Sequence, residues 1–198
     1  MPRVAAFDAA FGGIGVAVYD GQRIEAVRWK AFPAHNRTLA GLRDWLDTEV
    51  LPVVRSVDRV FVESTNVFPE AADAETGKPR SFMIQYQVSV RECAMAVSMW
   101  CVLMDVGHGD PEMVYPASWR SAYKSLIPKP RPKGAAAWKD WSCKTAPLLF
   151  PGCLNGLGQK AREDVADACL LASYGWSTMQ PSTKVLKEKK VTRSWQRS

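Results

Sequence analysis

The chain has 198 residues and a mass of 22.0 kDa, which suits a single domain. Hydrophobic residues make up 47% and charged residues 23%, close to the globular average, so wholesale disorder is not expected. No apolar run reaches the roughly 18 residues that a membrane span needs. Asp8 interrupts the apolar N-terminal stretch, so a secretion signal is not expected either.

The cysteines and histidines point away from zinc or disulfide chemistry. Five cysteines are an odd number and show no CxxC spacing, which favours reduced thiols. Only two histidines are available for a metal site or a catalytic triad. We therefore expect a soluble cytoplasmic protein without a membrane anchor.

The formal net charge of +6 is unevenly distributed along the chain. Residues 118–144 hold seven basic residues and one acid, and residues 184–198 hold six basic residues and one acid. The rest of the chain therefore carries about −5. Both basic segments contain tryptophan, and basic side chains beside aromatic rings suit phosphates and bases. Composition alone allows a second interpretation, a solvated basic face with tryptophans in the core.

The first third of the chain reads as a meander of strands followed by a helix. Asp20-Gly21 predicts a tight hairpin between two strands. Apolar residues at helical spacing predict a helix over 37–54, with Pro52 near its end. Strands are predicted over 4–7, 13–19, 23–29 and 59–63.

The remaining chain alternates helices, a short strand and polar loops. A polar loop is expected to about residue 79, and a Pro- and Lys-rich loop over 128–134. Helices are predicted over 81–104, 135–142 and 160–176, with a strand over 113–115. We expect residues 1–180 to form the domain and 181–198 a basic tail without an apolar pattern. The order predicts an α/β fold, a five-stranded mixed sheet with helices on both faces.

Four carboxylates stand where burial is expected. Asp8 and Glu63 each end an apolar strand, and Asp164 and Asp167 share one face of the last helix. Each acid alone has an ordinary explanation, as a turn residue, an arginine partner or a helix cap. Buried carboxylates repel one another, and a divalent cation that prefers oxygen ligands removes that cost. Together with the basic aromatic segments, the acids predict a metal-dependent nuclease site.

The order and spacing of these acids resemble the RuvC-like Holliday junction resolvases of the ribonuclease H-like superfamily. The resemblance covers almost the whole chain to about residue 176, and the ordered set of acids is its most specific part. The matching segments are AFDAAFGGIGVAVYDG (6–21), VFVEST (60–65), Gln85 and Gln87, VYPASWRSAYK (114–124) and EDVADACLLASYG (163–175).

The resemblance implies a ribonuclease H-like sheet, a homodimer and paired hydrolysis of four-way DNA junctions, without a small-molecule cofactor. It implies two Mg²⁺ or Mn²⁺ ions per active site, with Lys124 beside the phosphate at the cut. Glu163 competes with its neighbour Asp164 as a ligand. The implied metal ligands are Asp8, Glu63, Asp164 and Asp167, and the expected nucleic-acid contacts are Arg120, Lys124, Lys129, Arg131, Lys133 and Lys139.

Two departures from the family pattern concern the segments around the expected DNA groove. In the family, the first acid is usually followed by Pro-Gly or Ile-Gly. In this chain, Asp8 is followed by Ala9 and Ala10, and the first glycine is Gly12. The bulky PKPRPKGAAAWKDW replaces the family's glycine-rich Ala-Lys segment. This divergence suggests a viral or phage type.

Other functions stay open at this point. A related nuclease acting on RNA, on an RNA–DNA hybrid, on an rRNA precursor or on other branched DNA would use the same acids. An inactive junction-binding module is disfavoured because it gains nothing from four strained carboxylates. An actin-like or sugar-kinase fold needs two lobes, for which the chain is too short. Met95, Met99, Trp100 and Met104 on the long apolar helix fit either a core or a dimer face.

Overall fold

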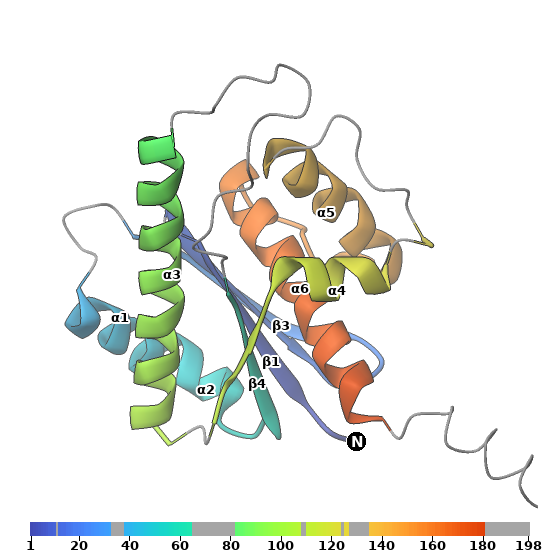
Figure 1. Ribbon diagram of the computed structural model, residues 1–198. Coiled ribbons are helices and arrows are strands. Elements are labelled where there is room, and N and C mark those ends of the chain that lie inside the picture. Colours follow the sequence, from blue (N-terminus) through green and yellow to red (C-terminus); the bar gives the residue numbers. More distant parts are fainter. Residues whose placement is uncertain are drawn as a thin grey trace, which may run out of the picture.

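Five strands form one mixed sheet at the centre of the computed structural model (Figure 1). The structure describes residues 1–10, 12–32, 38–64, 82–107, 110–123, 125–126 and 135–180. The strands are β1 (Val4–Ala10), β2 (Gly13–Tyr19), β3 (Ile24–Ala31), β4 (Arg59–Glu63) and β5 (Glu112–Val114). Their order is β3-β2-β1-β4-β5, with β2 antiparallel to β1 and β3, and β4 parallel to β1 and β5. The predicted five-stranded mixed sheet is confirmed.

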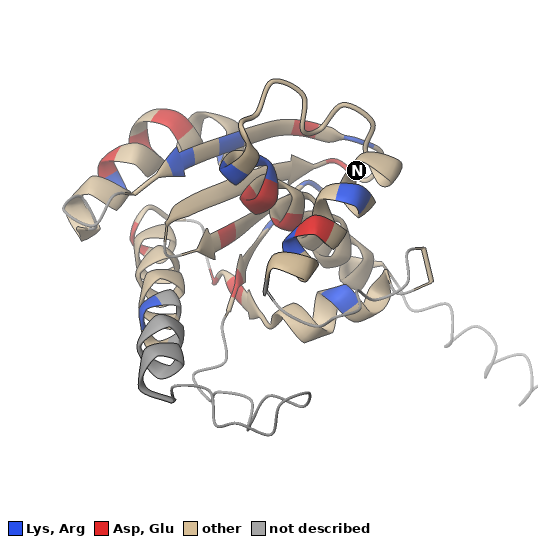
Figure 2. Ribbon diagram, turned by 90° about the horizontal axis from the view of Figure 1, so that it is seen from above, with Lys and Arg blue, Asp and Glu red and all other residues tan. Residues whose placement is uncertain are grey.

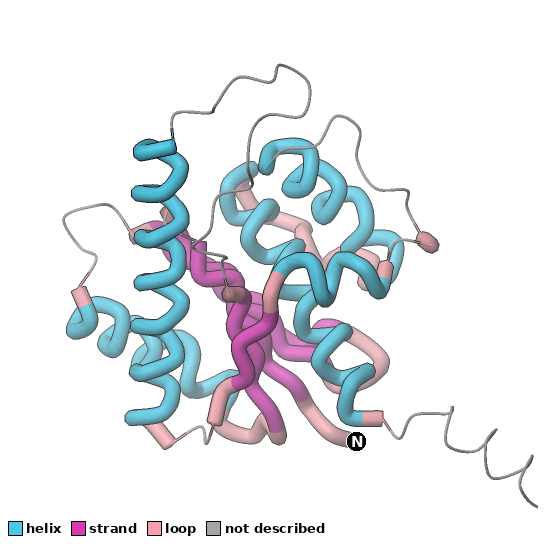
Figure 3. The backbone as a smooth tube through the Cα atoms, viewed as in Figure 1, coloured by secondary structure: helices cyan, strands magenta, loops and turns pink. Residues whose placement is uncertain are grey.

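Helices cover both faces of the sheet (Figure 3). One face packs against α1 (Leu39–Trp45), the π-helical turn η2 (Leu46–Val50), α2 (Leu51–Val54) and α3 (Phe82–Asp105). The other packs against α4 (Pro116–Ala122), α5 (Ala135–Leu149) and α6 (Gln159–Met179). Each face has its own apolar core, which is why the central strands are apolar on both sides.

The alternation of side chains along the strands decides where the acids point. Phe7 lies in the core under α3, so its neighbour Asp8 projects toward α6. Val62 likewise lies under α3 and sends Glu63 toward α6. Phe7 and Val62 are partners in the parallel β1–β4 pair, so the acids that follow them stand side by side.

Two helical segments differ from the sequence prediction. The sequence pattern predicts no helix at α4, where Pro116 marks the end of a strand, but proline is tolerated in the first turn of a helix and opens α4 in the structure. Helix α5 extends to Leu149, well beyond the predicted residue 142, and contains Pro147. The loops predicted up to residue 79 and over 128–134 fall largely outside the described residues, as does the tail after Gln180.

The long helix α3 contributes to the core only in part. Met99 is fully buried, and Met95 is half-buried against the same core. Met104 is 40% exposed. Of the two interpretations that the sequence leaves open for these methionines, Met99 therefore follows the core.

Candidate metal centre

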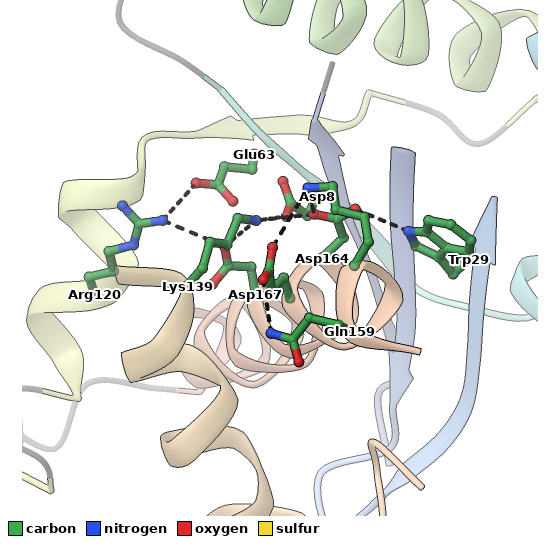
Figure 4. A network of polar contacts seen from close by, with 10 residues as sticks. Asp8, Trp29, Glu63, Arg120, Lys139, Gln159, Asp164 and Asp167 are labelled. Atoms are coloured by element: carbon green, nitrogen blue, oxygen red, sulfur yellow. Dashed lines mark hydrogen bonds and ion pairs between the residues drawn. The ribbon is translucent and has the colours of Figure 1, made fainter. Parts of the chain in front are cut away.

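Four carboxylates from three elements converge at one point on the α6 face of the sheet (Figure 4). Asp8 comes from β1, Glu63 from the end of β4, and Asp164 and Asp167 from α6. All four are buried, and both α6 acids are fully so. One oxygen each of Asp8, Glu63 and Asp167 lies within 4.8 Å of the other two.

Helix α6 brings its two acids close to the acids of the strands because the helix lies directly on β2. Gly15 faces the backbone of Asp164 so closely that a Cβ at this position would lie 2.4 Å from the carbonyl carbon and oxygen of Asp164. Gly15 is also the partner of Asp8 in the β1–β2 pair. The glycine therefore brings the first acid of α6 next to the acid of β1.

Burial makes negative charge at this site unfavourable. It raises the pKa of Asp8 from 3.8 to about 7. The negative charges of Asp167 and Asp164 also raise this pKa, and the positive charge of Lys139 lowers it. Burial, followed by Asp8 and Asp167, also raises the pKa of Glu63 well above its usual value. The cluster needs positive charge to hold all its carboxylates ionised.

Lys139 from α5 places an ammonium group among the carboxylates. Its Nζ lies 2.6 Å from Asp8 Oδ2, 2.8 Å from Asp167 Oδ2 and 3.3 Å from Asp164 Oδ1. Burial lowers the pKa of Lys139, but the attraction of the carboxylates prevails and holds it well above its usual value. Lys139 therefore remains a cation at neutral pH.

Arg120 from α4 approaches the opposite side of the cluster. Its guanidinium Nη2 lies 3.6 Å from Glu63 Oε1 and 3.6 Å from Asp167 Oδ2. The guanidinium carbon also lies over the rings of Trp119 and Trp138, at 4.8 and 5.1 Å from their centres. These stacking contacts fix the direction of the arginine toward the acids.

Asp164 is held differently from the other three acids. Trp29 Nε1 donates to its Oδ2 at 3.0 Å, and Lys160 Nζ donates to its Oδ1 at 3.0 Å. The neighbouring Glu163 accepts from Gln159 Nε2 at 3.0 Å and is partly exposed. Of the two adjacent acids, Asp164 is the one that faces the cluster.

The remaining carboxylate oxygens fit a divalent cation. Within the described part of the chain, Glu63 Oε2 and Asp167 Oδ1 are buried and accept no hydrogen bond, whereas Asp167 Oδ2 lies 2.8 Å from Lys139 Nζ. Buried polar atoms without a hydrogen-bond partner are uncommon and call for a ligand or an ion. Mg²⁺ and Mn²⁺ prefer carboxylate oxygens, so these residues suit such an ion.

The predicted nucleic-acid contacts divide into two groups. Arg120 and Lys139 lie against the acids instead of on an open surface. The other four, Lys124, Lys129, Arg131 and Lys133, lie outside the described residues, as do the side chains of Gln85 and Gln87.

Two residues of the site, Trp29 and Lys160, were not predicted from the sequence, and Lys139 was predicted only as a nucleic-acid contact. Lys139 shares a helix face with Ser142 and Ala146, three and seven residues on, and the burial of that face is apparent only in the structure. Lys160 stands four residues before Asp164, a spacing that predicts a contact on one helix. Nothing in the sequence around Trp29 connects it with Asp164.

Comparison with known proteins identifies the fold. Neither the protein-family models nor the curated protein sequences match the chain. Among solved structures, the chain is similar to RuvC of Thermus thermophilus in complex with a Holliday junction substrate, with a TM-score of 0.50 and 11% identity over 88% of this chain and 96% of that one. A second structure of Thermus thermophilus RuvC gives a TM-score of 0.50 and 14% identity, over 89% of this chain and 96% of that one. The chain therefore has a RuvC-like, ribonuclease H-like fold.

The described helices include none that combines the length and the hydrophobicity needed to cross a membrane.

Proposed function

We propose that the protein is a metal-dependent endonuclease that resolves four-way DNA junctions. The observation that carries this proposal is the buried cluster of Asp8, Glu63 and Asp167, whose oxygens lie within 4.8 Å of one another between the sheet and α6 of a RuvC-like fold. A carboxylate cluster with buried oxygens that accept no hydrogen bond from the described residues is costly unless it binds a cation.

The proposed ligands are the four acids, with two Mg²⁺ or Mn²⁺ ions per site. When bound, the ions would supply Lewis-acid activation of water and neutralise the charge that develops on the phosphodiester. Trp29 and Lys160 orient Asp164 through its two oxygens. Arg120, held by its stacking on Trp119 and Trp138, balances the charge of the acids on the Glu63 side.

Branched DNA is the proposed substrate, on two grounds. One of the structures that the chain resembles is a RuvC bound to a Holliday junction. The segment 118–144, which supplies Arg120 and Lys139 to the site, carries a net +6 in the sequence, which suits a phosphate backbone. Lys124 is the proposed catalytic lysine at the phosphate, and Lys129, Arg131 and Lys133 are proposed phosphate contacts in a domain over 1–180.

A homodimer is proposed because α3 exposes a continuous apolar stripe. The stripe consists of Val90, Ala94, Val97, Cys101 and Met104, all of them exposed. The residues alternate steps of four and three, the spacing with which one helix packs along another. Two copies joined through this stripe would give two active sites for the two strands of a junction.

A cleavage assay on labelled substrates tests the proposed activity. We expect nicks on a four-way junction in Mg²⁺ that disappear in EDTA and fall by at least about 10²-fold in Asp167→Asn, because a ligand is lost while the fold keeps an isosteric side chain. Asp140→Asn is the matched control, since Asp140 is an exposed acid of α5 paired with Lys144. Its rate should equal that of the wild type.

The other outcomes separate the alternatives. Cleavage by Asp167→Asn at the wild-type rate would disprove the site. Cleavage of an RNA–DNA hybrid instead of the junction would keep the acids and change the substrate. Tight junction binding without cleavage of any substrate would identify an inactive binding module.

A further inference from the structure

Lys139 occupies the position among the acids where a bound cation is expected. One ammonium group contacts Asp8, Asp164 and Asp167, all within 3.3 Å (Figure 4). The lysine side chain is only 22% exposed. A lysine on α5 thus contacts three of the four carboxylates proposed to bind metal.

The placement of Lys139 is built into α5. The helix face that carries it is fully buried at Ser142 and Ala146, and Trp138 and Trp141 pack edge to face at 5.5 Å. Lys144 on the same helix offers a contrast, because its pair with Asp140 is 66% and 62% exposed. Lys139 is therefore not a surface lysine that happens to reach an acid.

The contacts of Lys139 divide the cluster into two parts. On one part, Asp167 Oδ2 and Asp8 Oδ2 contact the ammonium group. On the other, Asp167 Oδ1 and Glu63 Oε2 are buried and accept no hydrogen bond from the described residues. A cation can approach the second part with Lys139 in place, but it cannot take the first part without displacing Lys139.

We propose that Lys139 is an internal counter-ion, which holds the cluster together without metal and competes with a divalent ion for Asp8 and Asp167. The proposal deepens the proposed function, since it concerns metal binding at the same acids. It gives Lys139 a role in setting metal affinity: a cation held by Glu63 Oε2 and Asp167 Oδ1 would leave the ammonium group in place, whereas one held by Asp8 Oδ2 would have to displace it.

Titration of the full-length protein with Mn²⁺, without DNA, tests this competition. The signal of unbound Mn²⁺ in electron paramagnetic resonance gives the number and affinity of the sites. We expect Lys139→Met to bind its weaker Mn²⁺ ion at least about tenfold more tightly than the wild type, because a competing charge within a few ångströms is gone. The control Lys144→Met should bind Mn²⁺ as the wild type does.

A second measurement on the wild type does not depend on the folding of a variant. If Mn²⁺ displaces Lys139, its amine becomes accessible, so acetylation of Lys139 followed by mass spectrometry should speed up severalfold when Mn²⁺ is added. Acetylation of Lys144 should keep its rate. Slower or unchanged acetylation of Lys139 in saturating Mn²⁺ would overturn the proposal.

The outcomes distinguish this inference from the proposed function. If the wild type binds Mn²⁺ and folded Lys139→Met binds it equally or less tightly, the counter-ion role is overturned while the metal site stands. If neither protein binds Mn²⁺, the metal-dependent function fails, and the competition fails with it. Faster acetylation of Lys139 together with tighter binding by Lys139→Met supports both.

Discussion

Gly15 is the residue on which the geometry of the acids depends most directly. It pairs with Asp8 across β1 and β2, and a side chain there would meet the backbone of Asp164 at 2.4 Å and the nitrogen of Val165 at 2.7 Å. These neighbours are backbone atoms, which cannot rotate away as the end of a side chain can. Any larger residue must push α6 off the sheet, and with it two of the four acids.

We therefore predict that Gly15→Ala destabilises the protein and disturbs the site together. Overpacking of this kind costs about 1–3 kcal/mol of unfolding free energy. Urea unfolding measures the loss, and Mn²⁺ titration measures the weakened site. Gly12→Ala is the control, because the nearest atom to its added Cβ is Lys160 Cε at 3.8 Å, an ordinary contact. A Gly15→Ala protein as stable as Gly12→Ala would mean that α6 adjusts freely.

At the scale of residues, the sequence indicated the acids better than their partners. Asp8 and Glu63 were recognisable because each follows a run of apolar strand residues, although β1 continues past Asp8 to Ala10, and the structure brings both beside Asp167. The cations were harder to assign, because a lysine on a basic segment resembles any surface lysine. Only the tertiary packing of α5 shows that Lys139 points inward.

At the scale of elements, the sequence predicted the five strands of a mixed sheet and most of the helices in their order along the chain, whereas the order of the strands within the sheet comes from the structure. Strands β2 and β4 begin and end at the predicted residues, because a hairpin turn follows the first and each is a short continuous apolar run. Helix α4 was missed and α5 was drawn too short, and both errors involve proline. Pro116 opens one helix and Pro147 lies inside the other, where packing outweighs the local cost.

Helix α3 presents both a buried face and an apolar exposed one. Met99 and Leu103 are fully buried against the sheet, whereas Val97 and Met104 are 46% and 40% exposed. A helix that is apolar nearly all round is expected to be covered on both sides. In this molecule the sheet covers one side, and the proposed second copy would cover the other.

We predict that Val97→Glu, at the centre of this stripe, separates the proposed dimer into monomers. A charge placed there would be buried without a partner in the dimer, and exposed to water in the monomer. Sedimentation equilibrium on wild type and variant gives the masses. Leu148→Glu is the control, because Leu148 is an apolar residue of α5 that is 68% exposed and lies outside the stripe. A monomeric wild type, or a dimeric Val97→Glu, would contradict the proposed interface.

At the scale of the whole molecule, positive charge is concentrated in two segments of the sequence, and the rest of the chain is acidic. In Figure 2, basic and acidic positions both occur throughout the described helices and strands. The excess positive charge comes from residues 118–144 and 184–198, which together outweigh a remainder of about −5. If the site acts on DNA as proposed, such segments would offset the repulsion between the acidic remainder of the chain and the phosphates.

Removal of residues 184–198 should therefore weaken junction binding and flatten its dependence on salt. The deletion takes away a net charge of +5. Each lost phosphate contact lowers the slope of log affinity against log salt by about 0.9 on duplex DNA, so several units of slope are at stake.

Binding is measured by fluorescence anisotropy from low to moderate salt, with a full-length variant in which the six basic residues are glutamine as the control for length. The glutamine variant should match the deletion, since charge and not chain length releases the counterions. An unchanged slope in both would mean that the basic tail does not contact the nucleic acid, and would leave segment 118–144 to supply the phosphate contacts.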